Sequence, residues 1–82
     1  MTIKSQLSDE LDLLLQFHLD SMQEGIKIHH DAREGLIAAA QRLFDKGIIS
    51  QADGGYLTDL GMEAAEHLQH AIRILASQPA TR

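Results

Sequence analysis

Three side chains able to bind a divalent metal ion recur at helical spacing in the last third of the sequence. Glu63, His67 and His70 stand at positions i, i+4 and i+7, which place them on one stripe of a helix. A carboxylate and two imidazoles are ligands that Zn²⁺ accepts, but the sequence offers no Cys and no obvious fourth ligand. Because Glu and His also pair on ordinary helix surfaces, these residues are weak candidates for a metal site, and we expect no cofactor.

Catalytic groups are not recognisable in the sequence. No nucleophile stands beside a visible base, no glycine loop could cradle a phosphate, and no pair of acids marks a pocket. The glycines have local uses instead, since Gly47 ends a helix and Gly54 and Gly55 serve a turn. We therefore expect that the protein is not an enzyme.

Size and composition indicate one globular domain. The chain has 82 residues, of which 44% are hydrophobic. We expect the domain to cover residues 1–77 and a frayed polar tail to cover residues 78–82. The N-terminus has no apolar run behind a basic flank, and no segment has the length of a membrane span, so we expect neither a signal peptide nor a membrane partner. The lack of Cys fits a cytoplasmic protein.

Acidic residues outnumber basic ones, with 12 Asp and Glu against 7 Lys and Arg, for a formal net charge of −5. This balance argues against non-specific binding of nucleic acid, which depends on clustered Lys and Arg. The middle of the chain differs, because residues 25–47 carry four basic and three acidic residues, or +1. Candidate contacts with DNA therefore come from this segment.

The first predicted helix begins at Ser8, an N-cap candidate that two acidic residues follow. Helical spacing puts five leucines on one broad face: Leu7, Leu11, Leu14, Leu15 and Leu19. Leu13 and Phe17 form a second apolar stripe on the far side. A helix that is apolar on two sides is covered on two sides, either by another helix of the domain or by a second subunit. Leu13 and Phe17 are therefore candidates for a subunit interface.

The segment that follows this helix has two interpretations. Ser21 and Glu24 have the spacing of a capping box, which indicates a short helix over residues 22–27. Residues 26–29 alternate apolar and polar side chains, which indicates a strand. We favour the helix and keep the strand as the alternative.

Two longer helices are predicted in the rest of the chain. Asp31 can cap a helix over residues 31–46, which Gly47 can end. Thr58 can cap a helix over residues 59–76. The predicted core face of this last helix consists of Leu60, Ala64, Leu68, Ala71, Ile72 and Leu75.

A β-hairpin is predicted between these two helices. Residues 48–50 and 56–57 make its strands. Asp53-Gly54 between them is a strong signal for a type I′ turn, because both turn positions need a positive φ. The tip of this hairpin, residues 51–53, contains no Lys or Arg.

The layout from residue 40 to residue 61 resembles the winged helix-turn-helix family. The shared pattern is Ala40-x-x-Leu43-x-x-x-Gly47-Ile48-Ile49, then Asp-Gly-Gly, then Tyr56-Leu57-Thr58-x-x-Gly61. The resemblance implies a mainly α fold with a small β-hairpin, in which three to four helices accompany a two-stranded wing. It also implies that residues 21–27 form the first helix of the motif and residues 31–46 the recognition helix.

The whole chain also resembles a short bacterial family of uncharacterised proteins that share "QEGIK", "HHDA" and "GGYLTDLG". Some members are labelled DNA-binding proteins or transcriptional regulators, so the two resemblances imply a DNA-binding or transcription-associated module. The side chains that could contact DNA are Lys27, Gln41, Arg42 and Lys46. Asp31 and Glu34 at the start of the recognition helix oppose this function. The alternative is a protein–protein interaction or homodimerisation domain that does not bind DNA.

Overall fold

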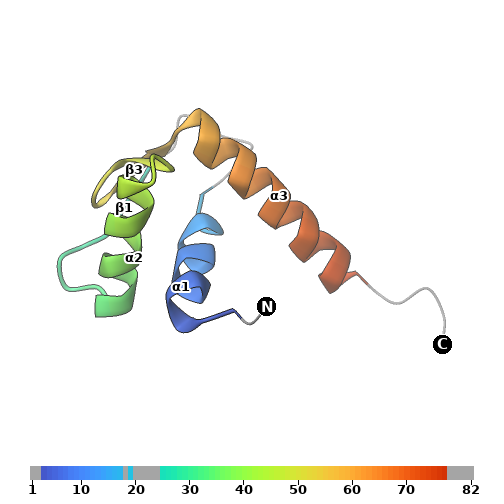
Figure 1. Ribbon diagram of the computed structural model, residues 1–82, viewed down its shortest axis with the longest axis horizontal. Helices are drawn as coiled ribbons and strands as arrows, with labels where there is room; N and C mark the ends of the chain where they lie inside the picture. Colours follow the sequence, from blue (N-terminus) through green and yellow to red (C-terminus); the bar gives the residue numbers. More distant parts are fainter. Residues whose placement is uncertain (1–2, 18, 20–24, 78–82) are drawn as a thin grey trace.

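The computed structural model describes residues 3–17, 19 and 25–77, which fold into helices and short strands (Figure 1). In chain order these elements are α1 (Ser5–Leu14), β1 (Ile26–Lys27), α2 (Glu34–Asp45), β2 (Ile49–Gln51), β3 (Gly54–Leu57) and α3 (Asp59–Ala76). The described part of the chain is therefore mainly helical with a small sheet, as predicted. No helix in this part is both long and apolar enough to cross a bilayer. The predicted tail, residues 78–82, lies outside the described residues.

The small sheet has three antiparallel strands in the order β1-β3-β2, one strand more than the predicted hairpin. The helix predicted for residues 22–27 is wrong where the structure describes it, because Ile26 and Lys27 pair with Gly55 and Gly54. Gly54 has no side chain, and a Cβ at this position would collide with the carbonyl oxygen of Ile26. This close approach lets β1 join the sheet, and pairing overrides the local helix signal.

The strand at residues 26–27 also bears on the helix-turn-helix motif. The resemblance places the first helix of that motif at residues 21–27, and the described end of this range is a strand. Residues 21–24 lie outside the described part of the chain. Among the described residues, α2 is the one helix between β1 and the hairpin.

The predicted hairpin is confirmed, but its turn is different. Gln51 pairs with Gly54, so Ala52 and Asp53 form the turn. In the described residues a positive φ occurs at glycines alone, at Gly54 (φ 127°) and Gly55 (φ 75°) in this region. Asp53 therefore does not adopt the type I′ conformation. The pairing between β2 and β3 shifts register between Ile49 and Gln51, as a β-bulge does, and Gly55 lies within that irregularity.

The start of each of the first two helices differs from its prediction by three residues. The Ser8 amide donates to the carbonyl of Lys4 at 2.9 Å, so α1 has already begun before Ser8. Asp31 does not cap α2, because a turn closed from Ala32 to His29 precedes the helix. By contrast, α3 has the predicted bounds, and the Thr58 hydroxyl accepts a hydrogen bond from the Gly61 amide at 3.1 Å.

The core lies between α1, α2, the sheet and the first half of α3. Its buried members are Leu13, Leu14, Phe17, Ile28, Ala40, Leu43, Ile49 and Ala65. Leu13 is 0% exposed and Phe17 is 3% exposed. The chain itself therefore covers the second stripe of the first helix, and these two candidates for a subunit interface are core residues.

The second half of α3 extends past this core (Figure 1). Of the predicted core face of this helix, Ala64 and Leu68 pack against the core, and the buried residue beside them is Ala65. Leu60, Ala71, Ile72 and Leu75 are exposed, which corrects the prediction for these four. The radius of gyration, 13.7 Å, exceeds the roughly 11.7 Å expected for a compact chain of this length.

Candidate interaction sites

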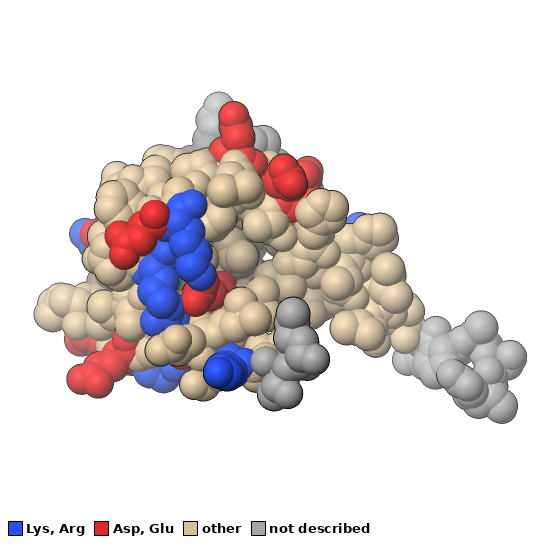
Figure 2. Space-filling view, in the orientation of Figure 1, with Lys and Arg blue, Asp and Glu red and all other residues tan. Residues whose placement is uncertain are grey.

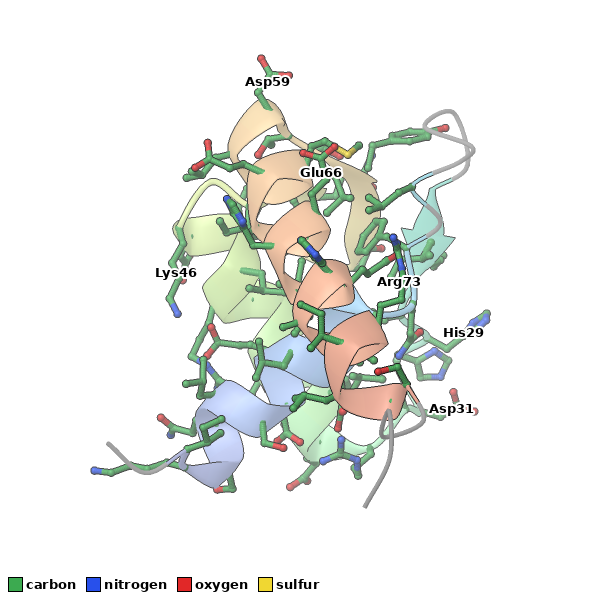
Figure 3. The ribbon with its side chains drawn as sticks, turned by 90° about the vertical axis from the view of Figure 1, so that its right-hand side faces the viewer. His29, Asp31, Lys46, Asp59, Glu66 and Arg73 are labelled. Atoms are coloured by element: carbon green, nitrogen blue, oxygen red, sulfur yellow. The ribbon has the colours of Figure 1, made fainter. Side chains whose placement is uncertain are left out.

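The four side chains proposed for DNA contact do not form one surface. Gln41, Arg42 and Lys46 belong to the second half of α2 or follow it, whereas Lys27 lies on β1. In Figure 3, Lys46 and His29, which is close to Lys27 in the sequence, lie on opposite sides of the domain. The basic side chains over α1 and α2 also lie directly beside acidic ones (Figure 2).

Glu10 of α1 contacts two of these candidates, Arg42 and Lys46. Its carboxylate accepts a hydrogen bond from Arg42 Nε at 2.8 Å and another from Lys46 Nζ. Arg42 also donates from Nη2 to the Gln6 carbonyl at 3.0 Å. Glu10 is the one buried charged residue of the described chain. Arg42 and Lys46 thus hold α1 against α2.

The acidity of Glu10 reflects this environment. Burial raises the pKa of the Glu10 carboxyl, but the hydrogen bonds and positive charges of Lys46 and Arg42 outweigh burial. The pKa of Glu10 is therefore below its ordinary value of 4.5. The carboxylate stays charged at neutral pH and pairs with two bases of the predicted DNA-binding surface, which lowers the net charge of this group from +2 to +1.

The remaining candidates also have acidic partners. Gln41 Nε2 donates to Asp45 Oδ1 at 3.0 Å, and Lys27 Nζ lies 3.8 Å from Asp53 Oδ2. Each of the four side chains therefore faces a carboxylate of its own chain. A DNA phosphate would have to compete with that carboxylate and would be repelled by it.

Replacement of Glu10 by Gln should destabilise the domain. We expect the free energy of unfolding, measured by urea denaturation, to fall by about 1–2 kcal/mol, because two charge-assisted hydrogen bonds are weakened. Asp9→Asn is the matched control, since Asp9 pairs with Arg33 at 3.0 Å on a more exposed part of α1. That change should cost less than about 0.5 kcal/mol. Equal losses in both variants would contradict the structural role of Glu10.

The difference between the parent and Glu10→Gln should depend on pH. A carboxyl whose pKa is lowered by folding adds stability above its unfolded pKa, and this contribution disappears as the pH falls through the folded pKa. The difference should therefore be largest near neutral pH and should shrink well below pH 4.5. A difference that grows on acidification would contradict this assignment.

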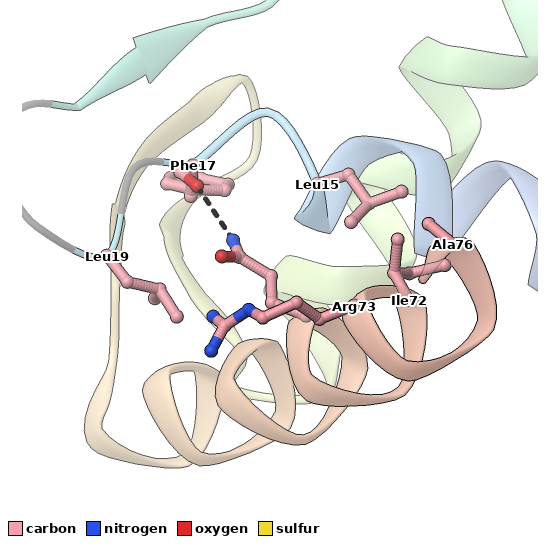
Figure 4. Close-up of a pocket in the computed structure, with 7 residues that line it drawn as sticks. Leu15, Phe17, Leu19, Ile72, Arg73 and Ala76 are labelled. Atoms are coloured by element: carbon pink, nitrogen blue, oxygen red, sulfur yellow. Dashed lines mark hydrogen bonds between the residues drawn. The ribbon is translucent and has the colours of Figure 1, made fainter. Parts of the chain in front are cut away.

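An apolar groove lies between the end of α1 and the second half of α3 (Figure 4). Its volume is about 560 Å³, and its lining residues are Leu15, Phe17, Leu19, Gln69, Ile72, Arg73 and Ala76. Gln69 Nε2 donates to the Phe17 carbonyl at 3.2 Å, which ties the segment after α1 to α3. The groove therefore has a fixed base, and five of its seven lining residues are apolar, with Gln69 and Arg73 as the polar members.

The exposed side chains beside this groove continue the stripe that α3 uses for its own packing. Gly61, Ala65, Leu68, Ile72 and Leu75 follow each other at helical spacings of four and three residues. Gly61 and Ala65 are buried, Leu68 is half-buried, Ile72 is 42% exposed and Leu75 is 80% exposed. The apolar stripe therefore extends beyond the part of α3 that packs on the core. We call Leu15, Ile72, Leu75 and Ala76 the distal α3 surface.

The candidate metal ligands belong neither to the groove nor to the distal α3 surface. Glu63, His67 and His70 are exposed along α3. Across residues 3–17, 19 and 25–77, no three His, Cys, Asp or Glu side chains are grouped closely enough to hold a metal ion. The helical periodicity of the sequence predicts Ile72 and Leu75 in the core and therefore does not reveal the distal α3 surface. The polar tail after residue 76 was the available signal, because such a tail offers no apolar cover.

Comparison with known proteins gives a family but no activity. Neither the curated proteins nor the solved structures include a significant match to this chain. Residues 1–76 match the model of a family of unknown function, DUF5669. Since the match spans nearly the whole sequence, the chain belongs to the DUF5669 family.

Proposed function

We propose that this domain is a protein-interaction module and that the distal α3 surface is its binding site. The observation that carries this proposal is the stripe of α3, which is buried in its first half and exposed at Ile72 and Leu75. Removing apolar area from water is the main favourable contribution to most protein association. A large aliphatic side chain that is 80% exposed next to an apolar groove is a suitable anchor for a partner.

The charge distribution supports the same site. Between residues 67 and 77, Arg73 is the one Lys, Arg, Asp or Glu residue. The centres of protein interfaces are depleted of charged side chains, whereas surfaces that bind DNA are strongly basic. The distal α3 surface therefore has the composition of a protein interface.

DNA binding is the second candidate function. An α2 helix followed by a hairpin and a closing helix is compatible with a winged-helix-like fold, and this arrangement favours it. The carboxylate partners of Lys27, Gln41, Arg42 and Lys46 oppose it. The protein-interaction role has no comparable opposing contact, so we rank it first.

Site-specific photo-cross-linking tests the proposed function. A benzophenone amino acid at position 75, in cells that express the full chain, should give a discrete protein adduct. The same amino acid at position 63 is the control, because Glu63 is exposed and does not belong to the apolar stripe of α3. Adducts of equal yield at both positions, or none at position 75, would contradict the proposal.

A titration with mixed-sequence duplex DNA separates the two candidate functions. We expect no binding at roughly 50 mM salt, where phosphate contacts are strongest. Binding that is lost in an Arg42→Gln, Lys46→Gln variant that remains folded would favour the DNA-binding role instead.

A further inference from the structure

We infer that a second pocket, where β1, α2 and the turn after β2 meet, binds a free amino acid with an aliphatic side chain. Residues between positions 27 and 53 line this pocket, so it is separate from the distal α3 surface. The inference therefore goes beyond the proposed function and does not depend on it. The volume of the pocket is about 300 Å³, at the small end of the range for ligand pockets, which suits a ligand of a few carbon atoms.

The inner part of this pocket is aliphatic. Ile28 and Ala40 line it and are buried, with exposed fractions of 7% and 1%, so they form its floor. Ile37 of α2 and Ala52 of the turn also line it and are exposed, so they form its sides. An aliphatic side chain that enters the pocket would leave water and contact these four residues.

Two opposite charges stand at the exposed edge of the pocket. Lys27 Nζ lies 3.8 Å from Asp53 Oδ2, which is longer than a hydrogen bond, and the two side chains are 71% and 50% exposed. Each charge can therefore bind a further group of opposite sign. The backbone fixes the segments that carry the two charges, because the Ile28 amide donates to the Asp53 carbonyl at 2.7 Å and Lys27 pairs with Gly54.

This pair of charges favours a zwitterion over an ion of one sign. An anion attracted by Lys27 would be repelled by Asp53, and a cation attracted by Asp53 would be repelled by Lys27. A free α-amino acid carries its carboxylate, its ammonium and its side chain on one carbon atom. The carboxylate can face Lys27 and the ammonium can face Asp53, while the side chain enters the aliphatic part of the pocket.

Two histidines add donors on the same pocket. His29 and His30 both line it and are exposed. An imidazole has an N–H donor in either protonation state, so both residues can donate to the carboxylate of the ligand. The described lining thus supplies more donors for a carboxylate than acceptors for an ammonium, and Asp53 is the residue that makes the pocket select a zwitterion.

Amide NMR spectra of the full chain during a titration with L-leucine test the inference. We expect saturable shift changes at residues 27–30, 37–40 and 52–54, with a Kd between about 0.1 and 1 mM, as for a small ligand in an open pocket. Three analogues each lack one part of the ligand: 4-methylpentanoate lacks the ammonium, 3-methylbutylamine lacks the carboxylate, and glycine lacks the aliphatic side chain. Each should bind at least about tenfold more weakly, because one contact is lost.

Asp53→Asn separates recognition of the ammonium from an effect on the fold. This variant should bind L-leucine at least about tenfold more weakly, and it should bind 4-methylpentanoate more tightly than the parent does, because the repulsion of the ligand carboxylate is removed. Asp12→Asn is the matched control, since Asp12 is exposed on α1 and outside the pocket. It removes the same charge and should leave both affinities unchanged.

Three results would overturn the inference. They are the absence of saturable shift changes with L-leucine, an affinity of the parent for 4-methylpentanoate equal to that for L-leucine, and an affinity for L-leucine that Asp53→Asn leaves unchanged. Should Asp53→Asn fail to fold, as its amide spectrum would show, the comparison of L-leucine with the three analogues on the parent decides.

Discussion

Gly61→Ala should destabilise the domain by about 3 kcal/mol, although Ala is the better helix former by about 1 kcal/mol. Gly61 lies in the first turn of α3, and a Cβ at this position would collide with the Ile48 carbonyl oxygen. That oxygen is held in place, because it accepts hydrogen bonds from the Thr58 amide at 3.0 Å and from the Thr58 hydroxyl at 3.1 Å. The helix would have to move away from β2, and the cap at Thr58 would be disturbed.

Gly35→Ala is the matched control for this prediction. Gly35 lies in the first turn of α2, and its added Cβ would meet the ends of the Arg33 and Asp9 side chains, which can rotate away. Gain in helix propensity and loss of an exposed ion pair should nearly cancel, so we expect a change within about 1 kcal/mol. Urea denaturation at one fixed protein concentration measures both. If Gly61→Ala is as stable as the parent, α3 does not pack on the Ile48 carbonyl.

The role of Gly61 matters for the binding site as well as for stability. Contact between the first turn of α3 and Ile48 sets the direction in which the helix leaves the sheet. That direction carries the second half of α3 past the core and opens the groove beside Leu15. A side chain at position 61 would collide with the Ile48 carbonyl, which explains the glycine in the pattern Leu57-Thr58-x-x-Gly61.

Leu13→Ala should lower the free energy of unfolding by about 3 kcal/mol, a large part of the roughly 4–12 kcal/mol expected for a domain of this size. Leu13 is fully buried, so truncation removes apolar contacts and leaves a cavity between α1 and the rest of the core. Leu7→Ala on the same helix is the control, since Leu7 is 39% exposed. It should cost about 1 kcal/mol or less.

This comparison also separates a core role from an interface role for Leu13. A core residue loses stability on truncation without changing the mass of the native protein in sedimentation. If Leu13→Ala has the stability of Leu7→Ala but changes the oligomeric mass, Leu13 lies in a subunit interface after all.

The parts of the fold that depend on neighbouring residues could be predicted from the sequence. Thr58 and the apolar spacing after it predict α3 over residues 59–76, and the structure has the same bounds. The hairpin also follows from local signals, because Asp-Gly-Gly interrupts two short apolar runs. The conformation of its turn does not follow, since the glycines of the sequence allow several turns and the pairing with β1 selects one.

The parts that depend on distant residues could not be predicted. β1 forms because Gly54 accepts the close approach of Ile26 and Lys27, which lie about thirty positions earlier. Arg42 is a surface base in the sequence, and its partner Glu10 is 32 residues away. Periodicity likewise shows that α3 has an apolar stripe, but it cannot show where the rest of the chain stops covering it. The candidate binding site is the uncovered part of that stripe.

The cross-linking yield at position 75 relative to position 63 tests most directly whether the second half of α3 is a protein-binding surface. Leu75 is the most exposed large hydrophobic residue of the described chain, and it continues a stripe whose first half is buried. We predict a discrete protein adduct at position 75 and little or none at position 63. Equal yields at the two positions, or no adduct at position 75, would contradict it.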